Sequence, residues 1–191
     1  MALKPLPEIL LGSKSPRRAT LIADLGLNYR QLSADIEEVY PPSLKAAEIA
    51  VYLAEKKSMA LRSQLKDGEV LLCSDTVVWC DNRSLEKASS PAEAEKMLQF
   101  LSGKEHEVIT GVCLSDKGKS RSFSDTTRVR FKKLTEAEIA HYITTFQPFD
   151  KAGAYGIQEW IGMIGVEQII GSYFTVMGLP SHLIYQELQE W

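Results

Sequence analysis

Cysteine and histidine are scarce in this sequence. It contains three residues of each kind, placed singly at Cys73, Cys80 and Cys113 and at His106, His141 and His182. An odd number of scattered cysteines does not make a disulfide framework, and neither residue type shows the short ligand spacing of a zinc site. We therefore expect reduced, mostly buried thiols, a cytoplasmic location and no zinc centre.

Long apolar runs and a surplus of positive charge are also missing. No stretch approaches the roughly 20 apolar residues of a membrane helix, and residues 1–8 lack both the apolar run and the cleavage site of a signal peptide. Lysine and arginine number 22 against 25 acidic residues, for a formal net charge of −3. We therefore expect neither a membrane nor nucleic acid as a partner, although a local basic pocket remains compatible with this balance.

The order of apolar patterns predicts the fold class. Helix-like and strand-like segments alternate early, and two long strands expected to be antiparallel follow. The expected strands are 9–11, 27–32, 69–80, 107–115, 120–131 and 166–170, and the expected helices are one from Pro16 and those over 43–65, 90–101, 135–145 and 180–188. The 191 residues contain no repeat and no linker. We expect a single domain over residues 1–191, an α/β fold with a mixed, twisted β-sheet flanked by helices.

A polar segment, residues 12–18, joins the first expected strand to the first expected helix. Ser15 is a good N-cap and Pro16 is favoured at the first helical position. The turn should therefore present backbone N–H groups and the positive end of the helix dipole beside Arg17 and Arg18. This arrangement suits a phosphate chain, and the alternative is an ordinary helix start with solvated arginines.

Asp75 interrupts the most apolar run of the chain, residues 69–80. Burying an unpaired charge is costly, so this carboxylate needs a reason to be there. It can act as a general base or a metal ligand, or it can simply accept hydrogen bonds at a strand bend. Both interpretations stay open at this point.

Further polar groups lie on other segments. Lys56 and Lys57 fall within the helix expected at 43–65, where lysines are usually solvated. Residues 150–158 combine two glycines with Asp150, Lys151 and Gln158, which suits either close backbone approach or a plain connection. Cationic groups suit a triphosphate, while carboxylates suit a divalent cation and an activated water.

Three common motifs are absent from the sequence. There is no G-x-x-x-x-G-K-[ST], no G-x-G-x-x-G after a strand and no G-x-S-x-G. The residues alone therefore indicate an enzyme of phosphate chemistry that works with a metal ion.

Several motifs in order along nearly the whole chain resemble those of the Maf family of nucleoside triphosphate pyrophosphatases. They are Ser13-Lys-Ser-Pro-Arg-Arg18, Leu53-Ala-Glu-Lys-Lys57, Ser74-Asp-Thr76, Leu85-Glu-Lys87, Asp125-Thr-Thr127, residues 150–158 and residues 176–180. The resemblance implies a Maf/ITPase-like fold with two lobes around a cleft. It also implies hydrolysis of a nucleoside triphosphate to the monophosphate and pyrophosphate with Mg²⁺ or Mn²⁺, and it is compatible with a homodimer.

The family's site residues carry over to positions of this sequence. The resemblance assigns phosphate binding to Ser13, Arg17, Lys57 and Lys87. It makes Asp75 the general base, with Glu37 assisting through the metal or water, so that these two carboxylates are also the expected metal ligands. Together with Asp75 and Glu37, the two lysines form the expected catalytic set, because cations stabilise the charge that grows on the leaving pyrophosphate.

The resemblance also indicates a substrate subtype. Arg18, Thr76 and Gln158 match the branch that resembles dTTP/UTP pyrophosphatases, and we expect them to bind the substrate. A glutamine amide can pair with the edge of uracil or thymine, and the small threonine leaves room for a pyrimidine. The alternatives are a 7-methyl-GTP-type enzyme and a nucleotide-binding regulator of cell division, although a binder has no need of a base at position 75.

The sequence departs from the family pattern at a few places. Gly12 stands where alanine is usual, Ser74 replaces the alanine before Asp75, and Ala88 replaces a proline. The segment 159–165 lacks the usual Gly-x-Gly-Ala, and Trp160 within it is expected to reshape the mouth of the base pocket.

Overall fold

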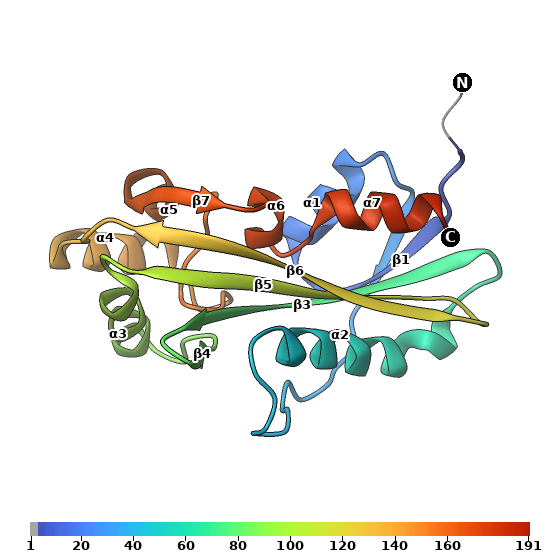
Figure 1. The fold of residues 1–191 in the computed structure, drawn as a ribbon, viewed down its shortest axis with the longest axis horizontal. Coiled ribbons are helices and arrows are strands. Elements are labelled where there is room, and N and C mark those ends of the chain that lie inside the picture. The colour runs from blue at the N-terminus through green and yellow to red at the C-terminus, as the bar shows by residue number, and fades with distance from the viewer. Residues whose placement is uncertain (1–3) are drawn as a thin grey trace. The chain divides into compact units, whose positions relative to one another are not determined.

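A mixed β-sheet runs through the computed structural model, which describes residues 4–191; Met1–Leu3 of the N-terminal segment lie outside it. The strands are β1 (Glu8–Gly12), β2 (Tyr29–Leu32), β3 (Glu69–Cys80), β4 (Arg83–Leu85), β5 (Glu105–Ser115), β6 (Ser120–Phe131) and β7 (Val166–Ile170). In this described part of the chain, seven strands form one sheet in the order β2-β1-β3-β5-β6-β7, with β4 paired to β3 (Figure 1). β1 is parallel to β2 and β3, whereas the pairs β3–β4 and β6–β7 are antiparallel, so the predicted mixed α/β fold is confirmed.

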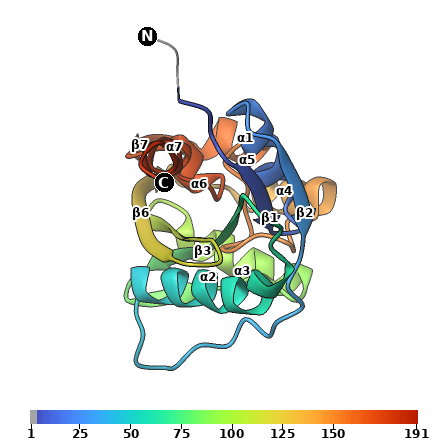
Figure 2. The same ribbon diagram turned by 90° about the vertical axis from the view of Figure 1, so that its right-hand side faces the viewer.

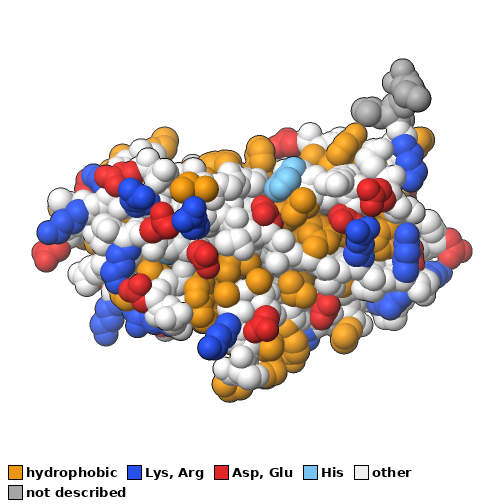
Figure 3. Space-filling view, in the orientation of Figure 1, with side chains coloured by type: hydrophobic (Ala, Val, Ile, Leu, Met, Phe, Trp, Pro, Cys, Tyr) orange, Lys and Arg blue, Asp and Glu red, His pale blue; other side chains and the backbone are white. Residues whose placement is uncertain are grey.

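Helices flank this sheet. They are α1 (Pro16–Asp24), α2 (Ala47–Leu61), α3 (Pro91–Leu101), α4 (Glu136–Phe146), α5 (Trp160–Gly165), α6 (Tyr173–Val176) and α7 (Ser181–Gln189), with a 3₁₀ turn at Arg62–Gln64. Within residues 4–191, none of them has the length and hydrophobicity that a membrane span requires. Positive and negative side chains are mixed over the face drawn in Figure 3, in keeping with the nearly balanced charge.

Contacts divide the chain into two compact units. Unit 1 comprises the chain up to Asp75 together with Thr110–Asp125 and Gly178–Trp191, and unit 2 comprises Thr76–Ile109 and Thr126–Met177. The boundary thus falls inside β3, between two residues that the sequence assigns to the site. We describe the two units one at a time.

In unit 1, helices cover both faces of the strands. Figures 1 and 2 show α2 on one face and α1 and α7 on the other. A glycine in β5 lets α2 lie this close, because a Cβ at Gly111 would collide with the backbone of Ala50 and Val51. Gly12 has a similar role, since a Cβ there would collide with the buried Cys73 sulfur, which explains the departure from alanine at this position.

The limits and the buried face of α2 differ from the prediction. The helix begins at Ala47 and not after Ser43, because Ala46 has a positive φ of 45° and two turns occupy the preceding residues. The apolar positions of the expected helix recur at steps of three and four residues, and this spacing predicts Met59 on the buried face; Met59 is instead 78% exposed. The buried face instead carries Ile49, Ala50, Leu53, Ala54, Ser58 and Leu61. Lys57 follows Leu53 at a helical spacing of four and therefore lies beside this face.

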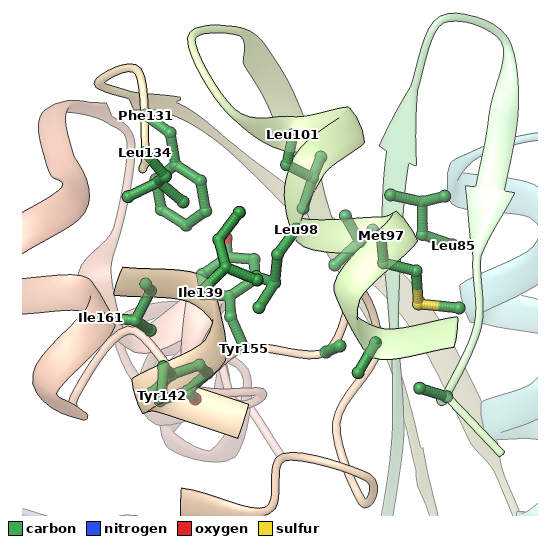
Figure 4. Packing of buried hydrophobic residues seen from close by; sticks show 14 of the residues in the cluster. Leu85, Met97, Leu98, Leu101, Phe131, Leu134, Ile139, Tyr142, Tyr155 and Ile161 are labelled. Atoms are coloured by element: carbon green, nitrogen blue, oxygen red, sulfur yellow. The ribbon is translucent and has the colours of Figure 1, made fainter. Parts of the chain in front are cut away.

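Unit 2 has its own hydrophobic core, in which α3 packs against α4 and α4 against α5. Figure 4 shows Leu98 and Leu101 of α3 facing Ile139 of α4, with Phe131, Tyr142 and Tyr155 in the same cluster. Both α3 and α4 begin at serine or threonine caps, at the positions where the sequence predicts the helices to start: the Ser90 and Thr135 hydroxyls accept the N–H groups of Glu93 and Glu138. The short helices α5 and α6 lie where the sequence predicted no helix; six and four residues are too few to show a helical period.

His106 lies in this core and is expected to make stability depend on pH. Its Nε2 is 2.7 Å from the Tyr155 hydroxyl, and within residues 4–191 its Nδ1 has no hydrogen-bond partner. Burial lowers the pKa of His106 from 6.5 to about 4. The unfolded chain therefore binds a proton near pH 6.5 that the folded protein does not bind until about pH 4. The free energy of unfolding should thus fall as the pH drops through this range.

Urea unfolding at pH 7 and pH 4.5 measures this effect. We expect a loss of about 2 kcal/mol from His106 between these two values. In His106→Gln, which cannot take up the proton, the difference between the two pH values should shrink by that amount. An equal acid loss in the wild type and in His106→Gln would contradict the assignment to His106.

Candidate active site

The turn between β1 and α1 is built around a buried serine. The Ser13 hydroxyl oxygen accepts the Ser15 N–H at 3.1 Å, and its carbonyl accepts a hydrogen bond from Gln31 Nε2 at 2.6 Å. Helix α1 begins at Pro16 as predicted, and the Ser15 side chain makes no cap hydrogen bond. It therefore does not compete with an anion for the N-terminus of α1. Arg17 lies half-buried in the first turn.

Arg18 ties three segments of unit 1 together. Its Nε donates to the Gly178 carbonyl at 2.8 Å, and its Nη1 donates to the Ser74 carbonyl at 2.9 Å and to Ser13 Oγ at 3.3 Å. Burial lowers the pKa of Arg18, and Asp75 opposes this effect. The serine that replaces the usual alanine also has a partner, since Ser74 Oγ donates to the Gly178 carbonyl at 3.4 Å. Arg18 thus holds the surroundings of Asp75 in place, and its contact with substrate stays a prediction.

Asp75 and Lys57 form an ion pair next to Arg18. The Lys57 ammonium bonds both to the Asp75 carboxylate and, at 2.8 Å, to Glu38 Oε1. The side chains of Lys57 and Asp75 are only 11% and 12% exposed, so solvent screens the pair little. Burial raises the pKa of Asp75, while Lys57 and then Arg18 act to lower it. A buried carboxylate with a raised pKa beside fixed cations has the properties of a general base.

The neighbouring lysine has a different role. Lys56 Nζ donates to the carbonyls of Glu37 at 2.8 Å and Val39 at 3.3 Å, and so holds the loop that precedes α2. The structure therefore brings Lys57, and not Lys56, to Asp75. It brings the Glu38 carboxylate to Lys57 and the Glu37 backbone carbonyl to Lys56, and both glutamates are exposed. The sequence did not single out Glu38, because two adjacent glutamates in one turn give no signal that separates them; the role of Glu37 stays a prediction.

The other predicted site residues belong to unit 2. Thr76 is half-buried on β3, Lys87 is exposed, and Gln158 is half-buried in a turn that the Glu159 N–H closes onto the Gly156 carbonyl at 3.0 Å. The backbone of Lys87 bridges to Ala152, and the Gly153 N–H donates to the carbonyls of Leu85 and Glu86 at 3.1 and 3.2 Å. Unit 2 thus joins two motifs that are more than 60 residues apart in the sequence, namely Leu85-Glu-Lys87 and the segment 150–158.

The carboxylates of unit 1 suit a hard divalent cation that is shared with substrate phosphates. No group of three or more histidine, cysteine, aspartate and glutamate side chains among residues 4–191 is placed to hold a metal ion by itself. Asp75 and Glu38 are two carboxylates that contact one ammonium group. Mg²⁺ commonly binds to one or two carboxylates together with substrate phosphates, so this donor set fits such an ion.

Comparison with known proteins places this architecture in a family. A family described as "Maf-like protein" matches residues 8–191. The dTTP/UTP pyrophosphatase of Phocaeicola vulgatus is 49% identical over 184 residues, which cover 96% of this chain and 95% of that protein. The protein of the same name from Christiangramia forsetii is 46% identical over 183 residues, covering 96% and 93% of the two chains.

A solved structure is similar at a lower level. The Ham1 protein of Staphylococcus aureus aligns with a TM-score of 0.46 at 15% identity, over 94% of this chain and 99% of that one. The family match and the identities to the two relatives extend over nearly the whole sequence, including every motif named above. The chain belongs to the Maf family.

Proposed function

We propose that this protein hydrolyses dTTP and UTP to the nucleoside monophosphate and pyrophosphate. The observation that carries the proposal is the buried Lys57–Asp75 pair, beside Arg18 and the Ser13 turn. Relatives that are 46–49% identical and bear the name dTTP/UTP pyrophosphatase support the choice of substrate. In the reaction, water adds across the anhydride bond between the α- and β-phosphates.

The roles of the unit 1 residues follow from their chemistry. Asp75 takes the proton of the attacking water, which requires its ionised form. Lys57 keeps Asp75 ionised and places a positive charge where negative charge develops on the leaving pyrophosphate. The Ser13 turn, Arg17 and the N-terminus of α1 bind phosphate oxygens.

In unit 2, Lys87 is a second cation for the phosphates, and Thr76 and Gln158 read the base. In unit 1, Arg18 is assigned to substrate binding as well. A glutamine amide offers one donor and one acceptor to a pyrimidine edge. Asp75, with Glu38 or Glu37, would hold a divalent cation such as Mg²⁺ or Mn²⁺; when bound, this ion neutralises phosphate charge. We further propose that residues 1–191 act as one domain, that the enzyme is cytoplasmic and that it can form a homodimer.

A nucleotide panel tests this proposal. Purified protein is incubated with dTTP, UTP, CTP, GTP or 7-methyl-GTP, with Mg²⁺, with Mn²⁺ or with EDTA. Pyrophosphate, phosphate and nucleoside monophosphate are then quantified. We expect equal amounts of pyrophosphate and monophosphate from dTTP and UTP, and none with EDTA. Release from 7-methyl-GTP alone would overturn the substrate assignment, and nucleotide binding without any turnover would favour the regulatory alternative.

A further inference from the structure

A buried polar network in unit 2 has no part in the chemistry described so far. Lys151 Nζ lies 3.0 Å from Glu159 Oε1 and 2.6 Å from Asp150 Oδ1. The side chain of Lys151 is 9% exposed and that of Glu159 is 20% exposed. Both charges are thus largely removed from water, and each needs the other.

Tyr142 connects this ion pair to α4. The residue is fully buried, and its ring stacks on that of Phe146, with the ring centroids 5.2 Å apart. Its hydroxyl donates to the Glu159 carboxylate and accepts the Gly156 N–H at 3.0 Å. The Tyr142 hydroxyl therefore links the Gly156 amide of the loop to the Glu159 carboxylate, and Tyr142 itself belongs to α4.

The turn that contains Gln158 is bonded to this network at both ends. The turn from Gly156 to Glu159 contains Gln158, and its first and last residues are both bonded to Tyr142, one through the amide and the other through the carboxylate. A Cβ added to Gly156 would lie 2.8 Å from Glu159 Cδ and 3.1 Å from Gln158 Nε2. The side chains of Glu159 and Gln158 therefore lie over the same glycine. A shift of the Glu159 side chain would change the space that is available to the Gln158 amide.

We propose that Glu159 and Tyr142 are positioning residues that orient Gln158, and that they thereby set the selectivity for uracil and thymine nucleotides over cytosine nucleotides. This inference rests on the proposed function, in which Gln158 reads the base. An amide distinguishes one base from another only if its donor and acceptor are held in one orientation, and a turn pinned at both ends provides this. The network includes a residue of the segment that departs from the family pattern, so Glu159 would supply a support that a glycine at this position could not.

Two isosteric variants test the proposal. Tyr142→Phe removes one oxygen and keeps the ring, and Glu159→Gln keeps the side-chain size. We expect the ratio of kcat/KM for UTP to that for CTP to fall about tenfold in each, through a higher KM for UTP, with kcat changed less. The double variant should lose no more than the larger single loss, because both residues act through one turn.

Matched controls are Tyr29→Phe on β2 and Glu136→Gln on α4, two exposed positions at which the ratio should stay at the wild-type value. Thermal melting identifies a variant that does not fold, in which case the other variant carries the test. A melting temperature that falls while the UTP-to-CTP ratio stays unchanged would overturn the positioning role and leave the proposed function intact. Absence of turnover in the wild type would instead refute the proposed function, and the positioning role with it.

Discussion

Asp75→Asn is expected to reduce kcat for pyrophosphate release from dTTP and UTP by about a thousandfold, the middle of the range for loss of a general base. The substitution keeps the size of the side chain and removes the group that accepts the proton. Nucleotide affinity should be largely retained, because the proposed phosphate ligands Ser13, Arg17 and Lys57 are unchanged in this variant. Turnover and equilibrium binding, measured on the same preparation, separate the two effects.

The control for this variant is Asp81→Asn. Asp81 follows the same strand, but its side chain is 61% exposed and pairs with Lys104, so its loss should leave the rate unchanged. The pH dependence gives a second readout. Burial raises the pKa of Asp75 above 3.8, and only the ionised form is active, so kcat/KM should fall as the pH drops through that raised value. Near-wild-type turnover in Asp75→Asn would show that another group takes the proton.

Lys57→Met is expected to lower kcat/KM about a hundredfold, because loss of one fixed group that stabilises transition-state charge has an effect of about this size. It also removes the cation shared by Asp75 and Glu38. The pKa of Asp75 should then rise further, because Lys57 is the strongest of the groups that lower it. The acid limb of the pH–rate profile should therefore move to higher pH.

Lys56→Met is the matched control, since this lysine precedes Lys57 on the same helix and bonds only to loop carbonyls among the contacts described for residues 4–191. Its loss should have a smaller effect on kcat/KM and leave the acid limb in place. Equal losses in the two variants, with no shift in either profile, would mean that the ion pair with Asp75 has no catalytic importance.

Features that depend on local sequence were predicted well. The strand at 69–80 and the strand at 120–131 have the predicted limits, since apolar runs and turn residues define them. The helix expected over 135–145 begins with a capping box of Thr135 and Glu138, whose partners are only three residues apart. The sequence also indicated Asp75 as a candidate site residue from local information, because it is a charged residue within an apolar run.

Features that depend on packing were predicted less well. The predicted start of α2 was wrong because Ala46 adopts a positive φ. The predicted buried face was wrong at Met59 because Met59 and Leu53 are equally apolar in the sequence, although only Leu53 is buried. The pairing of Glu38 with Lys57 depends on a loop held by Lys56. The link of Tyr142 to Glu159 joins residues 17 positions apart, for which no sequence spacing exists.

The sequence by itself determined the fold class, the family and the types of group available for catalysis, because apolar periodicity and ordered motifs are written along the chain. Only the tertiary structure decided which of two adjacent lysines contacts Asp75, which glutamate joins it, and how the Gln158 turn is supported. The physical reason is that the Lys57 contacts depend on which face of α2 is buried and on how closely Gly111 lets α2 approach β5. The support of the Gln158 turn depends on where the packing of α4 places the Tyr142 hydroxyl. Such distances are set by packing between segments that are remote in the sequence.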